Sequence, residues 1–194
     1  MARKPLKALV LACNTATAAA VKQLRETYPE LIVIGIEPAL KVAADHYPGG
    51  RIGVMATEVT LREEKFDTLL NRFHENCTVA KIPMPGLVQL VEAGKTGTPE
   101  MEALLQSLLE PYIGRLDAVV LGCTHYPLAA ADIQNVLGKT VVLLDGGDGT
   151  ARETLRRLKN AGLLEEGSGE LIMENSSGDP DMIRRGHALL DEER

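Results

Sequence analysis

Short apolar runs alternate with longer amphipathic stretches along this chain. The runs are continuous, which is typical of strands buried on both faces of a parallel sheet. They predict strands at residues 6–12, 31–36, 51–56, 78–82, 118–121, 140–144 and 171–173. The intervening stretches predict helices at residues 15–26, 38–44, 57–73, 87–93, 99–112, 129–137, 151–161 and 181–190. This alternation predicts an α/β fold with mostly parallel sheets and helices on both faces.

Local signals mark several helix starts. Pro38 suits the first turn of a helix. Thr57 or Thr60 is a candidate N-cap, and Glu63 completes a capping box with Thr60. Residues 145–150, with the sequence DGGDGT, predict a turn into the helix that follows.

Two of the predicted strands end in the same order of residue types. An apolar run is followed by a small residue, a cysteine and two polar residues, as in ALVLACNT at 8–15 and AVVLGCTH at 118–125. The cysteines, Cys13 and Cys123, are 110 positions apart. In open α/β sheets, ligands bind just beyond the carboxyl ends of the strands. The repeat therefore predicts two thiols in matching settings at a ligand site.

The chemistry of such a pair follows from the setting of each thiol. The positive end of a helix dipole and its free N–H groups favour the thiolate form of a cysteine at the helix N-terminus. If both thiols face one cavity, one accepts a proton while the other donates one to the opposite face of the same carbon. This inverts a stereocentre without a metal or redox cofactor. Asn14, Thr15 and Thr124 offer donors and acceptors for a small carboxylate or ammonium ligand.

Structural interpretations of the same residues compete with this one. For a single cysteine at a strand end, a packing role is favoured over a catalytic role by roughly two to one. The occurrence of two cysteines in the same pattern reverses that preference. Cys77 lacks the pattern and is interpreted as a structural thiol. His125 is also compatible with a capping or core imidazole, and Glu92 with a solvated helix residue. A zinc site needs three or four ligands, and no second cluster with ligand spacing accompanies Cys123 and His125.

Composition narrows the class of protein. The chain has 194 residues, 45% hydrophobic and 25% charged, with 3% aromatic residues and no Trp. A net charge of −6 without a basic run argues against nucleic-acid binding. No apolar run approaches the ~20 residues of a membrane span, and no signal peptide is apparent. Three cysteines without disulfide-like spacing favour reduced thiols and a cytoplasmic location.

Several motifs together resemble glutamate racemases of the aspartate/glutamate racemase superfamily. The segments are ACNTATAAA, GVMAT, LVEAGK, GCTHYPL, VVLLDGG and SSGDP, in family order from Leu6 onward. The resemblance implies cofactor-independent interconversion of L- and D-glutamate, which supplies D-glutamate for peptidoglycan. It implies the catalytic residues Cys13, Cys123, His125 and Glu92 and the substrate-binding residues Asn14, Thr15 and Thr124. It implies no metal, and a homodimer is the expected assembly.

The chain departs from the family pattern at its front end. Family members begin with a strand that ends in Asp-Ser-Gly, followed by a Pro-Tyr-Gly segment; both hold substrate, and neither is present here. We therefore expect impaired activity of this chain and an incomplete first domain, residues 1–36 plus 141–194, beside a second domain, residues 37–140. Exposed strand edges should promote dimerisation or segment exchange.

Three alternatives stay open at this point. A racemase for aspartate or another amino acid would use the same thiols. A non-catalytic binding or interaction protein would keep the fold without needing them. A metal-dependent enzyme is the most distant of the three.

Overall fold

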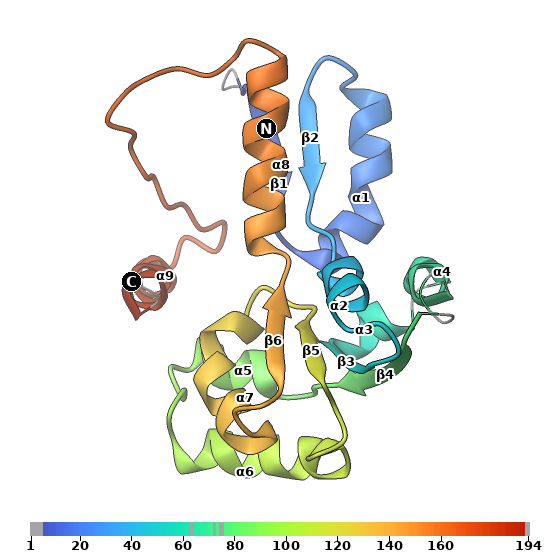
Figure 1. The fold of residues 1–194 in the computed structure, drawn as a ribbon. Helices are drawn as coiled ribbons and strands as arrows, with labels where there is room; N and C mark the ends of the chain where they lie inside the picture. Colours follow the sequence, from blue (N-terminus) through green and yellow to red (C-terminus); the bar gives the residue numbers. More distant parts are fainter. Residues whose placement is uncertain (1–5, 63, 72, 74–75, 193–194) are drawn as a thin grey trace.

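The computed structural model describes residues 6–62, 64–71, 73 and 76–192, and within them two parallel sheets lie one beyond the other (Figure 1). The first sheet pairs β1 (Ala8–Leu11) with β2 (Ile32–Gly35). The second has the order β4-β3-β5-β6, built from β3 (Arg51–Ala56), β4 (Thr78–Pro83), β5 (Ala118–Leu121) and β6 (Val142–Asp145). All pairings are parallel, as the continuous apolar runs predict. The α/β class is confirmed.

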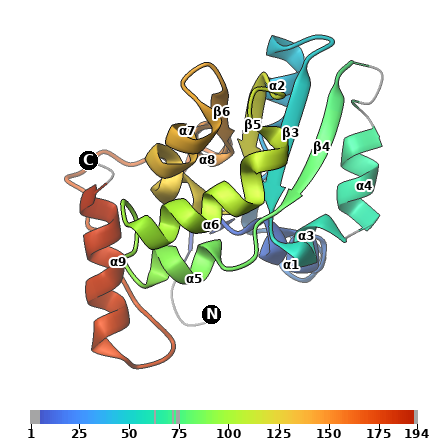
Figure 2. The ribbon, with the colours of Figure 1, turned by 90° about the horizontal axis from the view of Figure 1, so that it is seen from below.

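Helices cover both faces of the four-stranded sheet (Figure 2). On one face lie α5 (Leu87–Glu92), α6 (Pro99–Leu109), the 3₁₀ turns η1 (Glu110–Tyr112) and η2 (Tyr126–Ala129), and α7 (Ala130–Leu137). The other face packs against α2 (Leu40–His46) and the region of α3 (Glu58–Leu61) and α4 (Glu64–Asn71). Alternate residues of β3 pack into the hydrophobic cores on the two faces of the sheet. Met55 packs into the core beside α5–α7, and Ile52 and Val54 pack into the core beside α2. A sheet covered on both faces needs apolar residues at every central position.

The two-stranded sheet is covered by helices from opposite ends of the chain. The helix α1 (Asn14–Thr27) follows β1, and α8 (Gly147–Asn160) returns from the second sheet to contact both β1 and β2. An extended connection, residues 161–179, then leads to α9 (Pro180–Glu192), where Leu189 touches the core beside α5–α7. The chain thus crosses between the sheets twice, once after β2 and once after β6.

Several predicted boundaries are wrong for identifiable reasons. The helix predicted from Pro38 begins at Leu40, after residues without regular structure at 36–38, where the Glu37 carbonyl lies close to Gly146. The helix predicted at 57–73 is two helices: Thr57 caps the first through Thr60 N–H, and Lys81 bonds the Leu61 carbonyl where that helix ends. The capping box invoked Glu63, which lies outside the described residues.

Other predicted helix boundaries shift by a few residues. The helix predicted at 99–112 gives way to 3₁₀ geometry after Leu109, where Pro111 enters. The helix predicted from Ala151 already begins at Gly147, within the predicted turn. The first residues of the DGGDGT segment are therefore the turn, and the rest is helix.

The predicted strand Leu171–Met173 does not form. Its residues lie in the extended connection, where Leu171 and Ile172 are 65% and 64% exposed and no strand of the described segments forms a hydrogen-bonded ladder with them. The strand β6 pairs with β5, although the predicted boundary at 140/141 assigns its residues to the first domain. The division into two domains stays a prediction.

Candidate functional site

Cys13 lies at the N-cap of α1, directly after β1. Its backbone is extended, with φ −111° and ψ 125°, and its carbonyl accepts the first helical hydrogen bond from Thr17 N–H at 2.8 Å. The side chain is exposed. This thiol therefore has the helix N-terminal position that the sequence predicts.

Cys123 lies at the end of β5 but not at the start of an α-helix. The next element is the 3₁₀ turn η2, whose N-cap is His125, and α7 begins only at Ala130. Pro127 stands in the first turn of η2. The predicted match of the two settings is thus wrong in one respect, because the helix dipole acts directly on Cys13 alone.

One buried hydrogen bond joins the two cysteine turns. Asn14 Nδ2, next to Cys13, donates to the carbonyl of Gly122, next to Cys123, at 2.9 Å. Burial is the first cause of the raised pKa of Cys123, and the charge of Cys13 acts in the same direction. The tertiary structure therefore brings together two cysteine turns that are far apart in the sequence.

Polar contacts link Cys123 to His125 and His125 to Glu92. Cys123 Sγ lies 3.8 Å from His125 Nδ1, and His125 Nε2 lies 3.0 Å from Glu92 Oε1. Glu92 comes from the end of α5, on a different segment of the chain. A carboxylate that accepts from one ring nitrogen leaves the other nitrogen facing the sulfur, an arrangement suited to moving a proton at Cys123.

Burial is the main influence on the acidity of Cys123. Desolvation raises the pKa of its thiol, and the charges of Cys13 and Glu92 act in the same direction. The backbone N–H of His125 and the hydroxyl of Thr124 lower the pKa but do not reverse the shift. The surroundings of Cys123 therefore favour its neutral thiol form.

The predicted substrate-binding hydroxyls lie at the same place. Thr15 Oγ1 lies 2.9 Å from Thr60 Oγ1, which in turn lies 3.0 Å from Thr57 Oγ1. Thr124 is exposed beside Cys123. Sequence reasoning treated Thr57 and Thr60 only as capping candidates. The GVMAT segment ends at Thr57, at the carboxyl end of β3, and that position was the available signal of their proximity to the site.

Two buried polar atoms near the cysteines have no hydrogen-bond partner among the described residues. They are Asn14 Oδ1 and the hydroxyl of Tyr126. Burial holds the pKa of Tyr126 well above its usual range, and a charge at Cys123 raises it further. A buried oxygen without a hydrogen bond costs about 1–3 kcal/mol of folding free energy. The bond from Asn14 Nδ2 to Gly122 holds the side chain in place, and Oδ1 stays available as an acceptor.

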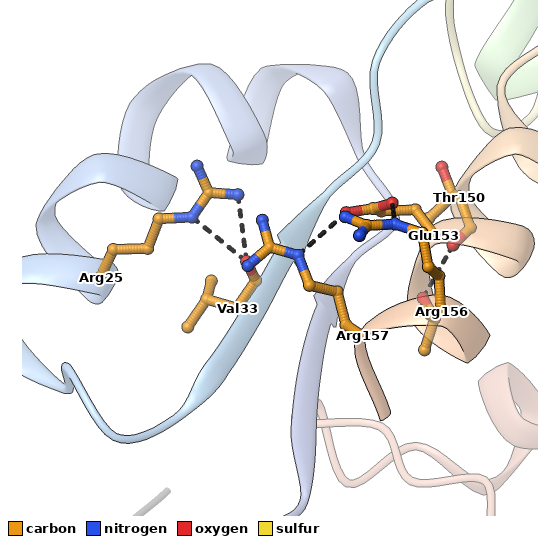
Figure 3. Close-up of polar contacts among 7 residues, drawn as sticks. Arg25, Val33, Thr150, Glu153, Arg156 and Arg157 are labelled. Atoms are coloured by element: carbon orange, nitrogen blue, oxygen red, sulfur yellow. Dashed lines mark hydrogen bonds and ion pairs between the residues drawn. The ribbon is translucent and has the colours of Figure 1, made fainter. Parts of the chain in front are cut away.

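A separate hollow of about 720 Å³ lies between the sheets at the two crossings. Figure 3 shows its polar wall, where Arg25 donates to the Val33 carbonyl and Arg157 to Glu153. Arg156 and Arg157 lower the pKa of Glu153 to about 2. None of the predicted site residues lines this hollow.

Neither a metal cluster nor a membrane helix occurs in the described part of the chain. No three His, Cys, Asp or Glu side chains there are disposed to hold a metal ion. No helix in that part is long and apolar enough to cross a membrane.

Comparison with known proteins gives consistent matches to one family. The Asp/Glu/Hydantoin racemase family profile matches residues 1–154. A glutamate racemase of Clostridium perfringens is 42% identical over 192 residues, covering 97% of this chain and 74% of its own length. The Escherichia coli glutamate racemase, solved with L-glutamate and the activator UDP-MurNAc-Ala, has 30% identity and a TM-score of 0.81. The match covers 98% of this chain and 72% of that one.

A third comparison, with the glutamate racemase isoform RacE1 of Bacillus anthracis, gives 33% identity and a TM-score of 0.73. It covers 84% of this chain and 62% of that protein, so the chain spans 62–74% of the length of these three relatives. The chain belongs to the Asp/Glu/Hydantoin racemase family and is a homologue of the glutamate racemases, which are isomerases.

Proposed function

We propose that this racemase-family chain interconverts L- and D-glutamate through Cys13 and Cys123. The observation that carries the proposal is the Asn14–Gly122 hydrogen bond, which ties the two cysteine turns together at one place. Glutamate is the substrate because the curated relatives are named glutamate racemases and the E. coli neighbour was solved with L-glutamate. The family role is to supply D-glutamate for peptidoglycan.

The reaction follows from two thiols that act on opposite faces of the substrate α-carbon. The thiolate of one cysteine takes the α-proton, and the thiol of the other delivers a proton to the carbanion from the far side. Substrate configuration inverts and the two sulfurs exchange protonation states, so the protons balance without a cofactor. The raised pKa of Cys123 makes it the neutral partner at the outset, with the His125–Glu92 pair beside it to assist proton movement.

Substrate contacts are proposed for the polar side chains around the thiols. Asn14 keeps an uncommitted buried oxygen, which suits an ammonium group. Thr15 and Thr124 offer hydroxyls for the carboxylates, and the N-terminus of α1 favours a negative charge beside Cys13. Three free cysteines suit a reducing compartment, and we propose a cytoplasmic homodimer.

The test is exchange of the glutamate α-proton in deuterated water, followed by NMR. We expect exchange from both enantiomers, and a loss of about 10²–10⁴-fold in Cys13→Ser and in Cys123→Ser. Cys77→Ala is the matched control, because the Cys77 thiol is buried in the other core and donates to the Phe73 carbonyl, away from the site. Absence of exchange in the folded chain, or exchange that survives both substitutions, would contradict the proposal. A panel of other amino acids separates a glutamate enzyme from a relative with another substrate.

A further inference from the structure

The contact between Glu92 and His125 is made by two partly exposed side chains. The carboxylate is 50% exposed and the imidazole 30%, with 3.0 Å between Oε1 and Nε2. A polar pair in such a position contributes little stability, because water competes for both groups and each side chain loses conformational freedom. The pair therefore does not hold its two segments together by itself, and contacts elsewhere set the distance between them.

Glu92 belongs to a segment that is fixed by its own backbone bonds. It is the last residue of α5, and the chain then turns through Gly94, which has a φ of 66°. Lys95 N–H donates to the Leu90 carbonyl at 2.9 Å, as in a Schellman motif at a helix end. Thr98 Oγ1 in turn donates to the Lys95 carbonyl at 2.7 Å. Glu92 and the loop that follows it therefore move as one unit.

His125 belongs to a second fixed segment. It is the N-cap of η2, and α7 begins where η2 ends. Tyr126 and Ala129 of η2 are 0% exposed, so packing in the core anchors this turn. Asp132 lies in the first turn of α7, where the positive end of the helix dipole favours a carboxylate. Continuous helical turns therefore fix the position of Asp132 relative to His125.

A contact between a backbone N–H and a carboxylate joins the two segments. Gly97 N–H, in the loop after Glu92, lies 3.1 Å from Asp132 Oδ1 and 3.2 Å from Oδ2. Hydrogen bonds to an ionised carboxylate are stronger than those between neutral groups. The helices α5, α6 and α7 lie side by side on this face of the sheet (Figure 2). The Gly97–Asp132 bond thus joins the same two segments as the contact between Glu92 and His125.

We propose that Asp132 is a positioning residue, which holds the loop after α5 through Gly97 so that the Glu92 carboxylate stays against His125 Nε2. The ring is then kept with Nε2 as the donor and with Nδ1 as the acceptor that faces the Cys123 sulfur. Asp132 acts through the Gly97 backbone and moves no proton itself. The proposal rests on the proposed function, because it concerns the groups that assist proton movement at Cys123.

The first test is a ¹⁵N NMR titration of the His125 ring without glutamate. The two nitrogen shifts of the neutral ring report which nitrogen carries the proton. In the native chain we expect the proton on Nε2. In Asp132→Ala the two shifts should move towards each other, since the ring is no longer held in one tautomer. Asp132→Asn should restore the native shifts, because its amide oxygen can still accept from Gly97 N–H.

The matched control is Gln134→Ala, on the same helix. Gln134 Nε2 donates to the carbonyls of Gly138 and Val141 at 2.7 and 2.8 Å, so its replacement loosens the far end of α7 only. It should leave the His125 shifts unchanged. The Gly97 amide should exchange with solvent at least about threefold faster in Asp132→Ala than in the native chain or in Gln134→Ala. Circular dichroism checks that every variant is folded.

The kinetic readout is the racemisation of glutamate. Asp132→Ala should lower kcat by about threefold to tenfold, less than the loss of about 10²–10⁴-fold for a missing acid or base, and leave KM unchanged. Native His125 shifts in Asp132→Ala would overturn the proposal. So would an equal change of these shifts in Gln134→Ala, or an increase in KM at constant kcat. A folded chain without any exchange activity would contradict the proposed function alone, because the NMR result still shows whether Asp132 positions His125.

Discussion

The Cys13 strand and the Cys123 strand share one residue pattern but have different surroundings. In β5 every residue is buried, because β3 and β6 pair with its two edges and helices cover its two faces. In β1 no residue is fully buried, because among the described residues only β2 pairs with it. Val120 and Val10 occupy equivalent positions, and they are 0% and 40% exposed. A local sequence thus specifies a strand and its turn, while the number of neighbouring strands determines how much that strand stabilises the fold.

The same contrast affects the residue before each cysteine. A Cβ on Gly122 would lie 2.7 Å from the Met55 carbonyl, since β3 passes directly alongside. The equivalent residue of the first segment, Ala12, is exposed. Glycine is therefore required where a neighbouring strand approaches closely, and alanine is accommodated where none does.

The largest difference in stability should come from the paired valines. Val120→Ala removes two methyl groups from a closed core and should cost about 2–3 kcal/mol. Val10→Ala should cost less than about 0.5 kcal/mol, because Val10 is half solvated. Urea unfolding of both variants measures the difference between their free energies of unfolding. Equal costs would mean that the two strands are equally buried in solution.

The next contrast concerns the small residues. Gly122→Ala should destabilise the protein by about 1–3 kcal/mol, as β3 must shift to admit the methyl group. Ala12→Gly should cost about 0.5–1 kcal/mol, from chain entropy alone. Thermal unfolding followed by circular dichroism compares them, and a harmless Gly122→Ala would show that the β3–β5 contact is loose.

The thiols themselves should differ in reactivity. We expect iodoacetamide to modify exposed Cys13 at least about tenfold faster than Cys123 at pH 7, and buried Cys77 slowest. Because the pKa of Cys123 lies above that of an ordinary thiol, its thiolate population should still be increasing with pH at pH 9. Mass spectrometry of the modified peptides follows each site. A Cys123 rate that levels off near neutral pH would contradict the direction of this shift.

The smallest effect is that of the Glu92 charge on Cys123. The carboxylate raises the pKa of Cys123, so Glu92→Gln should lower it and accelerate alkylation of Cys123 by less than about tenfold. Glu100→Gln is the control, since Glu100 pairs with Lys95 on an exposed surface. Slower alkylation in Glu92→Gln would mean that the carboxylate acts mainly by orienting His125.

Most elements were predictable from the sequence because apolar periodicity and caps are local. The strand at 51–56 was predicted to the residue, and the helices at 15–26 and 87–93 to within one residue at each end. The predictions fail where a group far away in the sequence determines the local structure. Lys81 bonds the carbonyl at the end of the helix at Leu61, and Gly146 lies against Glu37. Residues Leu171–Met173 have no strand beside them among the described residues. Hydrogen bonds between segments cannot be read from a residue's own neighbours.

For the site, the side chains that are present and the two strands that end in a cysteine can be identified from the amino-acid sequence. The contact of Asn14 with Gly122, that of Glu92 with His125, and the greater burial of Cys123 than of Cys13 arise from folding. Acidity depends on solvent exclusion and on charges from other segments, which exist only once the chain has folded.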